Sequence, residues 1–162
     1  FVYVPSKIAA LGFVLKDQSL IYLPVLLISV IIMVPCMIMT EKKNLHRLSM
    51  LGANIGLGLS ILLFYFGHSA SGIFIAMTLF FAAFNLLEAL LPSLVSRVAP
   101  DVSRGSAMGV YSTCQFAGVF VGGVSAGLAM EFAGDVGILI VCLSVCALWL
   151  LALYHFSWRS QI

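Results

Sequence analysis

Four long stretches of this chain carry no formal charge, and the charged residues gather in short groups between them. A helix needs ~20 apolar residues, at ~1.5 Å of rise each, to cross a hydrocarbon core of ~30 Å. The composition agrees with such crossings, because 62% of the 162 residues are hydrophobic and 9% are charged, too few to cover a water-soluble fold. The sequence therefore predicts a membrane protein. The charge-free stretches are residues 18–40, 48–87, 105–130 and 136–158.

The spans are predicted to be helices, because backbone polar groups in lipid must be satisfied within their own segment. The longest charge-free stretch can hold two crossings if a turn divides it, and "GHSASG" at residues 67–72 supplies small, turn-forming residues. The sequence thus predicts an all-α membrane protein with five complete helices and one partial helix. The expected ranges are 1–15 (partial), 20–40, 48–67, 72–96, 104–130 and 135–158.

The basic residues predict the orientation in the membrane. Six of the eight lie on the same side of an alternating topology, and the positive-inside rule assigns that side to the cytoplasm. The C-terminus is therefore expected in the cytoplasm, and the N-terminus within a span. The net charge of +2 is too small to suggest a nucleic-acid partner. The six residues are Lys42, Lys43, Arg47, Arg97, Arg104 and Arg159.

Patterns typical of enzymes and metal sites are missing from the sequence. It contains no C-x-x-C spacing, no H-E-x-x-H and no pair of aspartates in a span. The cysteines fall inside predicted spans, where they are interpreted as small apolar residues. We therefore expect no cofactor, no metal and no enzymatic activity. The cysteines are Cys36, Cys114, Cys142 and Cys146.

The helix expected over 72–96 carries a polar face. Steps of three and four residues place Asn85, Glu88 and Pro92 on that face. A charge at the bilayer centre costs ~2.5 to 3.5 kcal/mol, so such residues normally line a cavity or meet a partner. Pro92 cannot donate to the carbonyl of Glu88, which predicts a kink. Two simpler interpretations remain open: Glu88 is protonated in a packed interior, and Asn85 makes an interhelical hydrogen bond worth ~0.6 kcal/mol.

The helix expected over 104–130 is rich in glycine pairs spaced four residues apart, a pattern that lets helices pack closely. Its Tyr111, Ser112 and Gln115 are candidate cavity-lining residues, although Ser112 and Gln115 could equally bond a neighbouring helix. Lys7, in the partial first helix, is a candidate for the same cavity or a residue that snorkels to the interface. The glycines predicted to serve helix packing are Gly105, Gly109, Gly118, Gly122, Gly123 and Gly127.

Two segments, "LFFAAFNLLEALLPSLVSRVAP" and "GSAMGVYSTCQFAGVFVGGVSAG", carry a resemblance to a known family. With the rest of the chain they resemble the second half, spans seven (partial) to twelve, of a major facilitator superfamily transporter, and within it the YajR-type transporters of bacterial inner membranes. The resemblance implies two pseudo-symmetric six-helix bundles that rock about a central site. It further implies that the partners are an N-terminal six-helix half, the lipid bilayer and a small-molecule substrate.

The resemblance also implies roles for the polar residues. In such transporters the acidic residue of span ten joins a charge relay with the first half, so Glu88, Asn85, Pro92 and Arg104 are candidates for a gate or inter-half contact. The implied function is secondary transport of a small organic solute by alternating access, coupled to protons, as efflux (antiport) or uptake. "EKKNLHRLSMLG" occupies the place of a cytoplasmic motif but lacks its usual Gly and Asp-Arg pair. The alternative is a stand-alone membrane scaffold or assembly subunit without a transport cycle.

Overall fold

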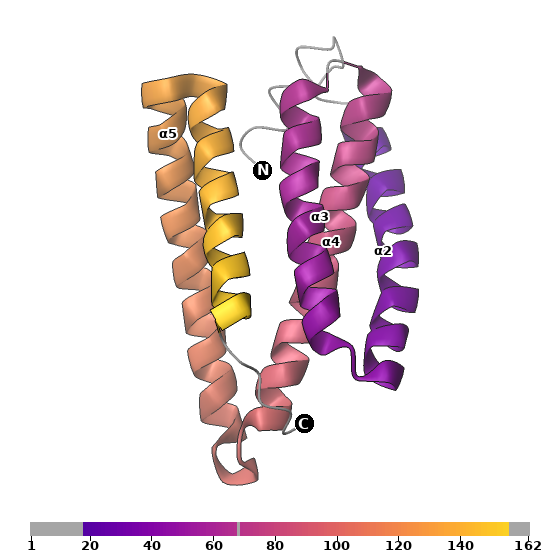
Figure 1. Ribbon diagram of the computed structural model, residues 1–162, viewed down its shortest axis with the longest axis vertical. Coiled ribbons are helices and arrows are strands. Elements are labelled where there is room, and N and C mark those ends of the chain that lie inside the picture. Colours follow the sequence, from indigo (N-terminus) through magenta and orange to yellow (C-terminus); the bar gives the residue numbers. More distant parts are fainter. Residues whose placement is uncertain (1–17, 68, 156–162) are drawn as a thin grey trace.

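The structure is a computed structural model that describes residues 18–67 and 69–155. Every element in these ranges is helical, so the predicted all-α fold class is confirmed (Figure 1). The helix expected over 1–15 and the candidate Lys7 lie outside the described residues. The elements are α2 (Gln18–Lys43), α3 (His46–Phe66), α4 (Ala70–Val98), a short 3-10 helix η2 (Asp101–Ser103) and α5 (Arg104–His155).

The longest element, α5, is two membrane crossings joined at a glycine. It has 52 residues, about 80 Å as one straight helix, whereas a bilayer core is ~30 Å thick. Gly134 interrupts the helix with φ 57° and ψ −141°, a backbone conformation that residues with a Cβ rarely adopt. Figure 1 shows the chain reversing there, so that the second arm returns toward the end where α5 began.

Short turns with defined chemistry separate the other helices. Asn44 connects α2 to α3 with φ 51°, in the left-handed region that asparagine tolerates better than most residues. Ser69 caps α4, because its hydroxyl accepts a hydrogen bond from the backbone N–H of Gly72 at 3.1 Å. These turns end one crossing and start the next within a few residues, as short loops between antiparallel helices require.

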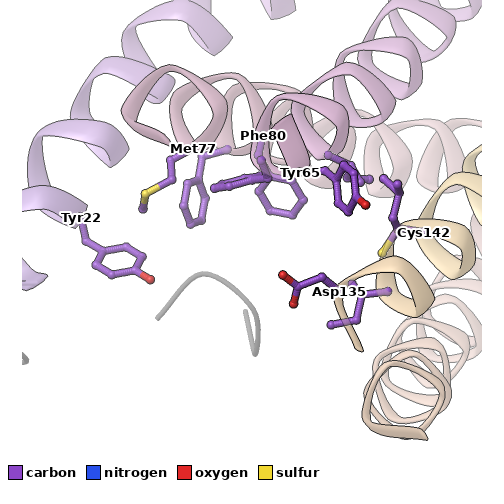
Figure 2. Close-up of a pocket in the computed structure, with 11 residues that line it drawn as sticks. Tyr22, Tyr65, Met77, Phe80, Asp135 and Cys142 are labelled. Carbon is purple, nitrogen blue, oxygen red and sulfur yellow. The ribbon is translucent and has the colours of Figure 1, made fainter. Parts of the chain in front are cut away.

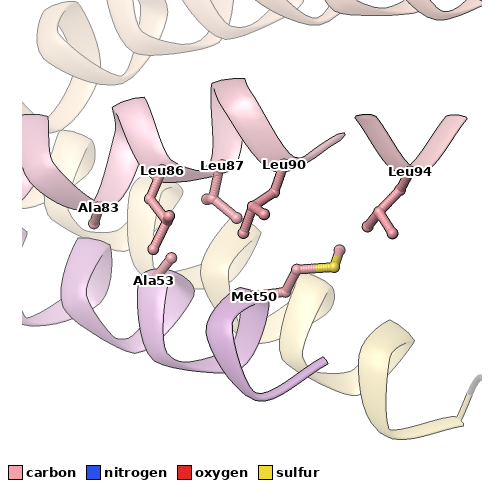
Figure 3. Close-up of a cluster of buried hydrophobic side chains, with 7 residues drawn as sticks. All are labelled: Met50, Ala53, Ala83, Leu86, Leu87, Leu90 and Leu94. Carbon is pink, nitrogen blue, oxygen red and sulfur yellow. The ribbon is translucent and has the colours of Figure 1, made fainter. Parts of the chain in front are cut away.

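The described core is built on α4. One buried cluster joins it to α2 and α3, with Val25 of α2 and Phe64 of α3 among its members. A second cluster, drawn in Figure 3, packs α4 against α3. Burial of these side chains positions the polar face of α4. The second cluster consists of Met50, Ala53, Ala83, Leu86, Leu87, Leu90 and Leu94.

In contrast, α5 packs sparsely within the described part of the chain. Its only buried residue there is Gly137, at the turn between the arms. At each of the six glycines predicted to serve helix packing, a Cβ would meet no described heavy atom within 4 Å. Large apolar side chains such as Phe116 and Phe120 are likewise exposed on this arm. If these glycines pack against another helix, that helix lies outside the described contacts, and their packing role stays a prediction.

Pro92 lies inside α4, which continues as one helix to Val98. The proline removes the backbone hydrogen bond to the carbonyl of Glu88 without ending the helix. A polar contact joins α3 to the second arm of α5, where the Asn54 amide donates to the carbonyl of Cys146 at 2.9 Å. A second, longer contact between the same elements runs from the Arg47 guanidinium to the carbonyl of Leu153 at 3.5 Å.

Replacing Gly137 by alanine tests the turn between the arms of α5. A Cβ at this position would overlap the carbonyl oxygen of Ala129, so the turn must deform. Overpacking of this kind costs ~1 to 3 kcal/mol. Gly137→Ala is therefore expected to lower the Tm of the purified full-length protein by several degrees. Gly58→Ala is the control, since a Cβ there has open space; equal Tm values for the two variants would contradict the proposed tight turn.

Candidate functional site

The carboxylate of Glu88 is paired with an amide from a neighbouring helix. Gln115 of α5 donates from Nε2 to Oε1 of Glu88 at 2.7 Å. Glu88 is exposed on the surface of the described chain, while Gln115 is half-buried. The sequence left two interpretations for Gln115, a cavity-lining residue or an interhelical hydrogen bond, and the structure shows the hydrogen bond. The amide satisfies one oxygen of Glu88 and leaves the side chain accessible.

The two residues meet because they lie at matching depths. Glu88 precedes the end of α4 at Val98 by ten residues, or ~15 Å. Gln115 follows the start of α5 at Arg104 by eleven residues, or ~16 Å. Both distances are measured from the same turn, which contains η2. Glu88 therefore lies inside the bilayer, in the half of α4 that is nearer to this turn.

Asn85, one turn before Glu88, contacts α2. Its Nδ2 donates to the hydroxyl oxygen of Ser29 at 3.3 Å, and that hydroxyl donates to the carbonyl of Leu26 at 2.8 Å. Ser29 is fully buried. The contact is the interhelical hydrogen bond that the sequence left open for Asn85, and it links α2 to α4 beside the candidate site.

Charged residues at the turn end of the helices form ion pairs. Arg104 binds Asp101 at 2.6 Å and donates from Nε to the carbonyl of Ser96 at 2.9 Å, which joins η2 and α5 to the end of α4. Arg97 of α4 pairs with Glu41 of α2. In the described structure, Arg104 thus stabilises the turn, and its predicted inter-half contact stays a prediction.

The other candidates from the sequence surround Gln115. Tyr111 and Ser112 lie four and three residues before it on α5, on the same side of the helix, and both are half-buried. Pro92 lies one turn beyond Glu88 on α4. Among residues 18–67 and 69–155, no group of three or more His, Cys, Asp or Glu side chains could hold a metal ion.

The turn between α4 and α5, which contains η2 and precedes Arg104, is called the Arg104 turn below. A cavity of about 120 Å³ lies at the other ends of the helices, away from this turn. Figure 2 shows Tyr22, Tyr65 and Phe80 around it, with Asp135 and Cys142 contributed by the second arm of α5. Ligand pockets usually measure ~300 to 1,000 Å³, so this cavity suits a group of about one ring. Its small size favours the accessible polar face of α4 and α5 as the candidate functional site.

Sequence reasoning missed several of these contacts. The pairing of Glu88 with Gln115 follows from their equal distances to one turn, a signal that could have found it. The pair Glu41–Arg97 could have been suggested by opposite charges at the same end of α2 and α4. Nothing in the sequence indicated that Asp135 lines an aromatic cavity, because its neighbours there come from four separate segments.

Comparison with known proteins identifies the family. The chain is 34% identical over 151 residues to the inner membrane transport protein YajR of Escherichia coli, covering 93% of this chain and 33% of that protein. It is 28% identical over 158 residues to an uncharacterized transporter of Buchnera aphidicola subsp. Baizongia pistaciae, covering 92% of this chain and 39% of that protein. The chain spans about a third of the length of these relatives. Because residues 2–161 match the Major Facilitator Superfamily, the chain belongs to this superfamily of transporters.

Proposed function

We propose that this chain is the C-terminal six-helix half of a proton-coupled secondary transporter that moves a small organic solute by alternating access. The observation that carries the proposal is the exposed carboxylate of Glu88 within the span of α4, held by the Gln115 amide. Charged groups inside membrane helices normally face a bundle interior or a water-filled cavity. An N-terminal six-helix bundle would supply the opposite wall of that cavity.

The exposed surface of α5 supports the same arrangement. Its first arm presents Tyr111, Ser112 and Gln115 beside Glu88, and the small residues Gly118 and Gly122 extend the arm with open space above them. Small residues allow close approach of another helix. We place the N-terminal half against this arm, so that the polar residues lie between the two bundles.

Glu88 is assigned a state-dependent role in this proposal. It accepts from Gln115 in one state and pairs with a basic residue of the N-terminal half in the outward-open state. Such coupling between two conformations is typically worth ~1 to 3 kcal/mol. A proton on Glu88 would weaken the inter-half ion pair, which gives the carboxylate a means of coupling proton movement to the change of state.

The proposed location is the inner membrane of a bacterium, with the C-terminus in the cytoplasm. The positive-inside rule supports this orientation, since the turn between α2 and α3 follows Lys42 and Lys43 and precedes Arg47. The name of the Escherichia coli relative, an inner membrane transport protein, supports the proposed location in the inner membrane. Efflux by antiport is the direction to examine first in a transport assay.

Glu88→Gln tests the state-dependent contact in the full-length transporter. An amide keeps the hydrogen-bonding size of the side chain but removes the charge that an ion pair needs. Losing ~1 to 3 kcal/mol is expected to reduce the outward-open fraction by about 5- to 150-fold relative to the inward-open one. Cysteine accessibility from each side of the membrane measures the two populations, and proton-driven transport is expected to fall with them.

The matched control is Glu131→Gln, which removes an exposed carboxylate near the turn of α5, far from Gln115. It is expected to leave both the populations and transport unchanged. Wild-type behaviour of the Glu88→Gln variant would remove the proposed contact. Equal losses in both variants would show that a general change in charge, and not position 88, is responsible.

Single cysteines in a cysteine-free background test the orientation. A cysteine at Asn44, in the turn between α2 and α3, is expected to react with a membrane-impermeant maleimide only after the cells are permeabilised. A cysteine at Ser69, in the turn between α3 and α4, is expected to react in intact cells. The reverse pattern would place the basic turns outside and contradict the proposed topology.

A further inference from the structure

An apolar groove of about 360 Å³ runs between α2 and α3, with α4 as its floor. Small residues leave the space: Gly52 and Gly56 on α3, and Ala82 and Ala83 on α4. At Gly52 a Cβ would meet no heavy atom within 4 Å. The groove lies on a different side of α4 from the contact with Gln115, since its walls come from α2 and α3.

The groove has the length of one bilayer leaflet. Its lining extends from Thr40 to Ile32 on α2, which is eight residues or ~12 Å, and from Leu45 to Gly56 along α3, which is eleven residues or ~16 Å. Half of a ~30 Å hydrocarbon core is ~15 Å. The groove therefore begins at the interface beside the α2–α3 turn and ends near the middle of the membrane.

Polarity changes along this length. The hydroxyl residues of its lining, Thr40 and Ser49, both lie at the turn end, where their hydroxyl groups contact each other. Deeper in the membrane, the lining is almost entirely aliphatic, with residues such as Ile32, Met33 and Leu79. A molecule that fits this gradient has a polar group at the interface and a flexible apolar chain below it.

Positive charge flanks the mouth of the groove. Lys42 and Lys43 are the last residues of α2 and are exposed, two and three residues after Thr40. The neighbouring carboxylate of Glu41 is already engaged by Arg97 of α4, so it does not offset the lysines. Basic residues at this position attract the anionic headgroups of the adjacent leaflet.

We propose that this groove is a binding site for an anionic phospholipid, with one acyl chain between α2 and α3 and its phosphate beside Lys42 and Lys43. The volume suits this occupant, since a methylene group takes roughly 30 Å³, about the share of one liquid water, and the groove holds about a dozen. A helix of ~10 Å diameter and the same length needs roughly 1,200 Å³, so a second copy of the chain fits poorly.

The test uses the full-length protein in nanodiscs that contain phosphatidylglycerol and phosphatidylethanolamine in equal amounts with identical acyl chains. Native mass spectrometry then counts the lipids retained by the released protein. Wild type is expected to retain phosphatidylglycerol preferentially. In the Lys42→Gln/Lys43→Gln double variant, the ratio of retained phosphatidylglycerol to phosphatidylethanolamine is expected to fall about tenfold, because the attraction of each lysine to an anionic headgroup is removed.

A larger side chain inside the groove tests the acyl-chain contact separately from the attraction between the lysines and the headgroup. Gly52→Leu places a side chain in the open space of the groove and is expected to remove the retained lipid whatever its headgroup. Gly58→Leu is the matched control on α3, since position 58 also has open space but does not line the groove. It is expected to keep wild-type retention.

Two results would overturn the proposal. Equal retention of both lipids by wild type, unchanged in the lysine and Gly52 variants, would show that the groove holds no specific lipid. A shift from dimer to monomer in the Gly52→Leu spectrum, without loss of lipid, would assign the groove to a second copy of the chain.

Discussion

The cost of placing a carboxylate in hydrocarbon governs the arrangement around Glu88. Such a group costs ~2.5 to 3.5 kcal/mol on insertion scales unless it reaches a partner or water. The chain meets this cost in two ways. The Gln115 amide donates to one carboxylate oxygen, and the side chain stays accessible on a face that the described helices do not cover. Both require α4 and α5 to meet at a fixed depth, which the Arg104 turn sets.

Packing explains why α4 can hold this position. Its apolar residues are buried against α2 and α3 in two clusters, which leaves Glu88 on a face that these two helices do not cover. Hydrogen bonds then fix the register of the helix, since Asn85 bonds to Ser29 on one side and Glu88 to Gln115 on the other. A rotation of α4 would break both contacts at once. The two contacts therefore hold α4 in one orientation against its neighbours.

Charge-free stretches and turn residues are local signals, so the sequence could indicate where the described helices lie. Gly134 shows this well: a break was expected between 130 and 135, and the backbone reverses at a glycine with positive φ. Contacts between helices were harder to predict, since hydropathy does not indicate which side chains face each other. Thus Glu88 was recognised as unusual, but its partner Gln115 was left between two roles. Asn54 was missed, because its contact with Cys146 spans 92 positions of the chain.

The central claim is that Glu88 changes its hydrogen-bonding partner between the inward-open and outward-open states. The most direct measurement is the structure of the full-length transporter, determined by electron cryomicroscopy in inward-open and outward-open states. The account predicts a basic side chain of the N-terminal half within ion-pair distance of Glu88 in the outward-open state only, with Gln115 as its partner in the other. The same Gln115 contact in both states, with no basic residue nearby, would contradict it.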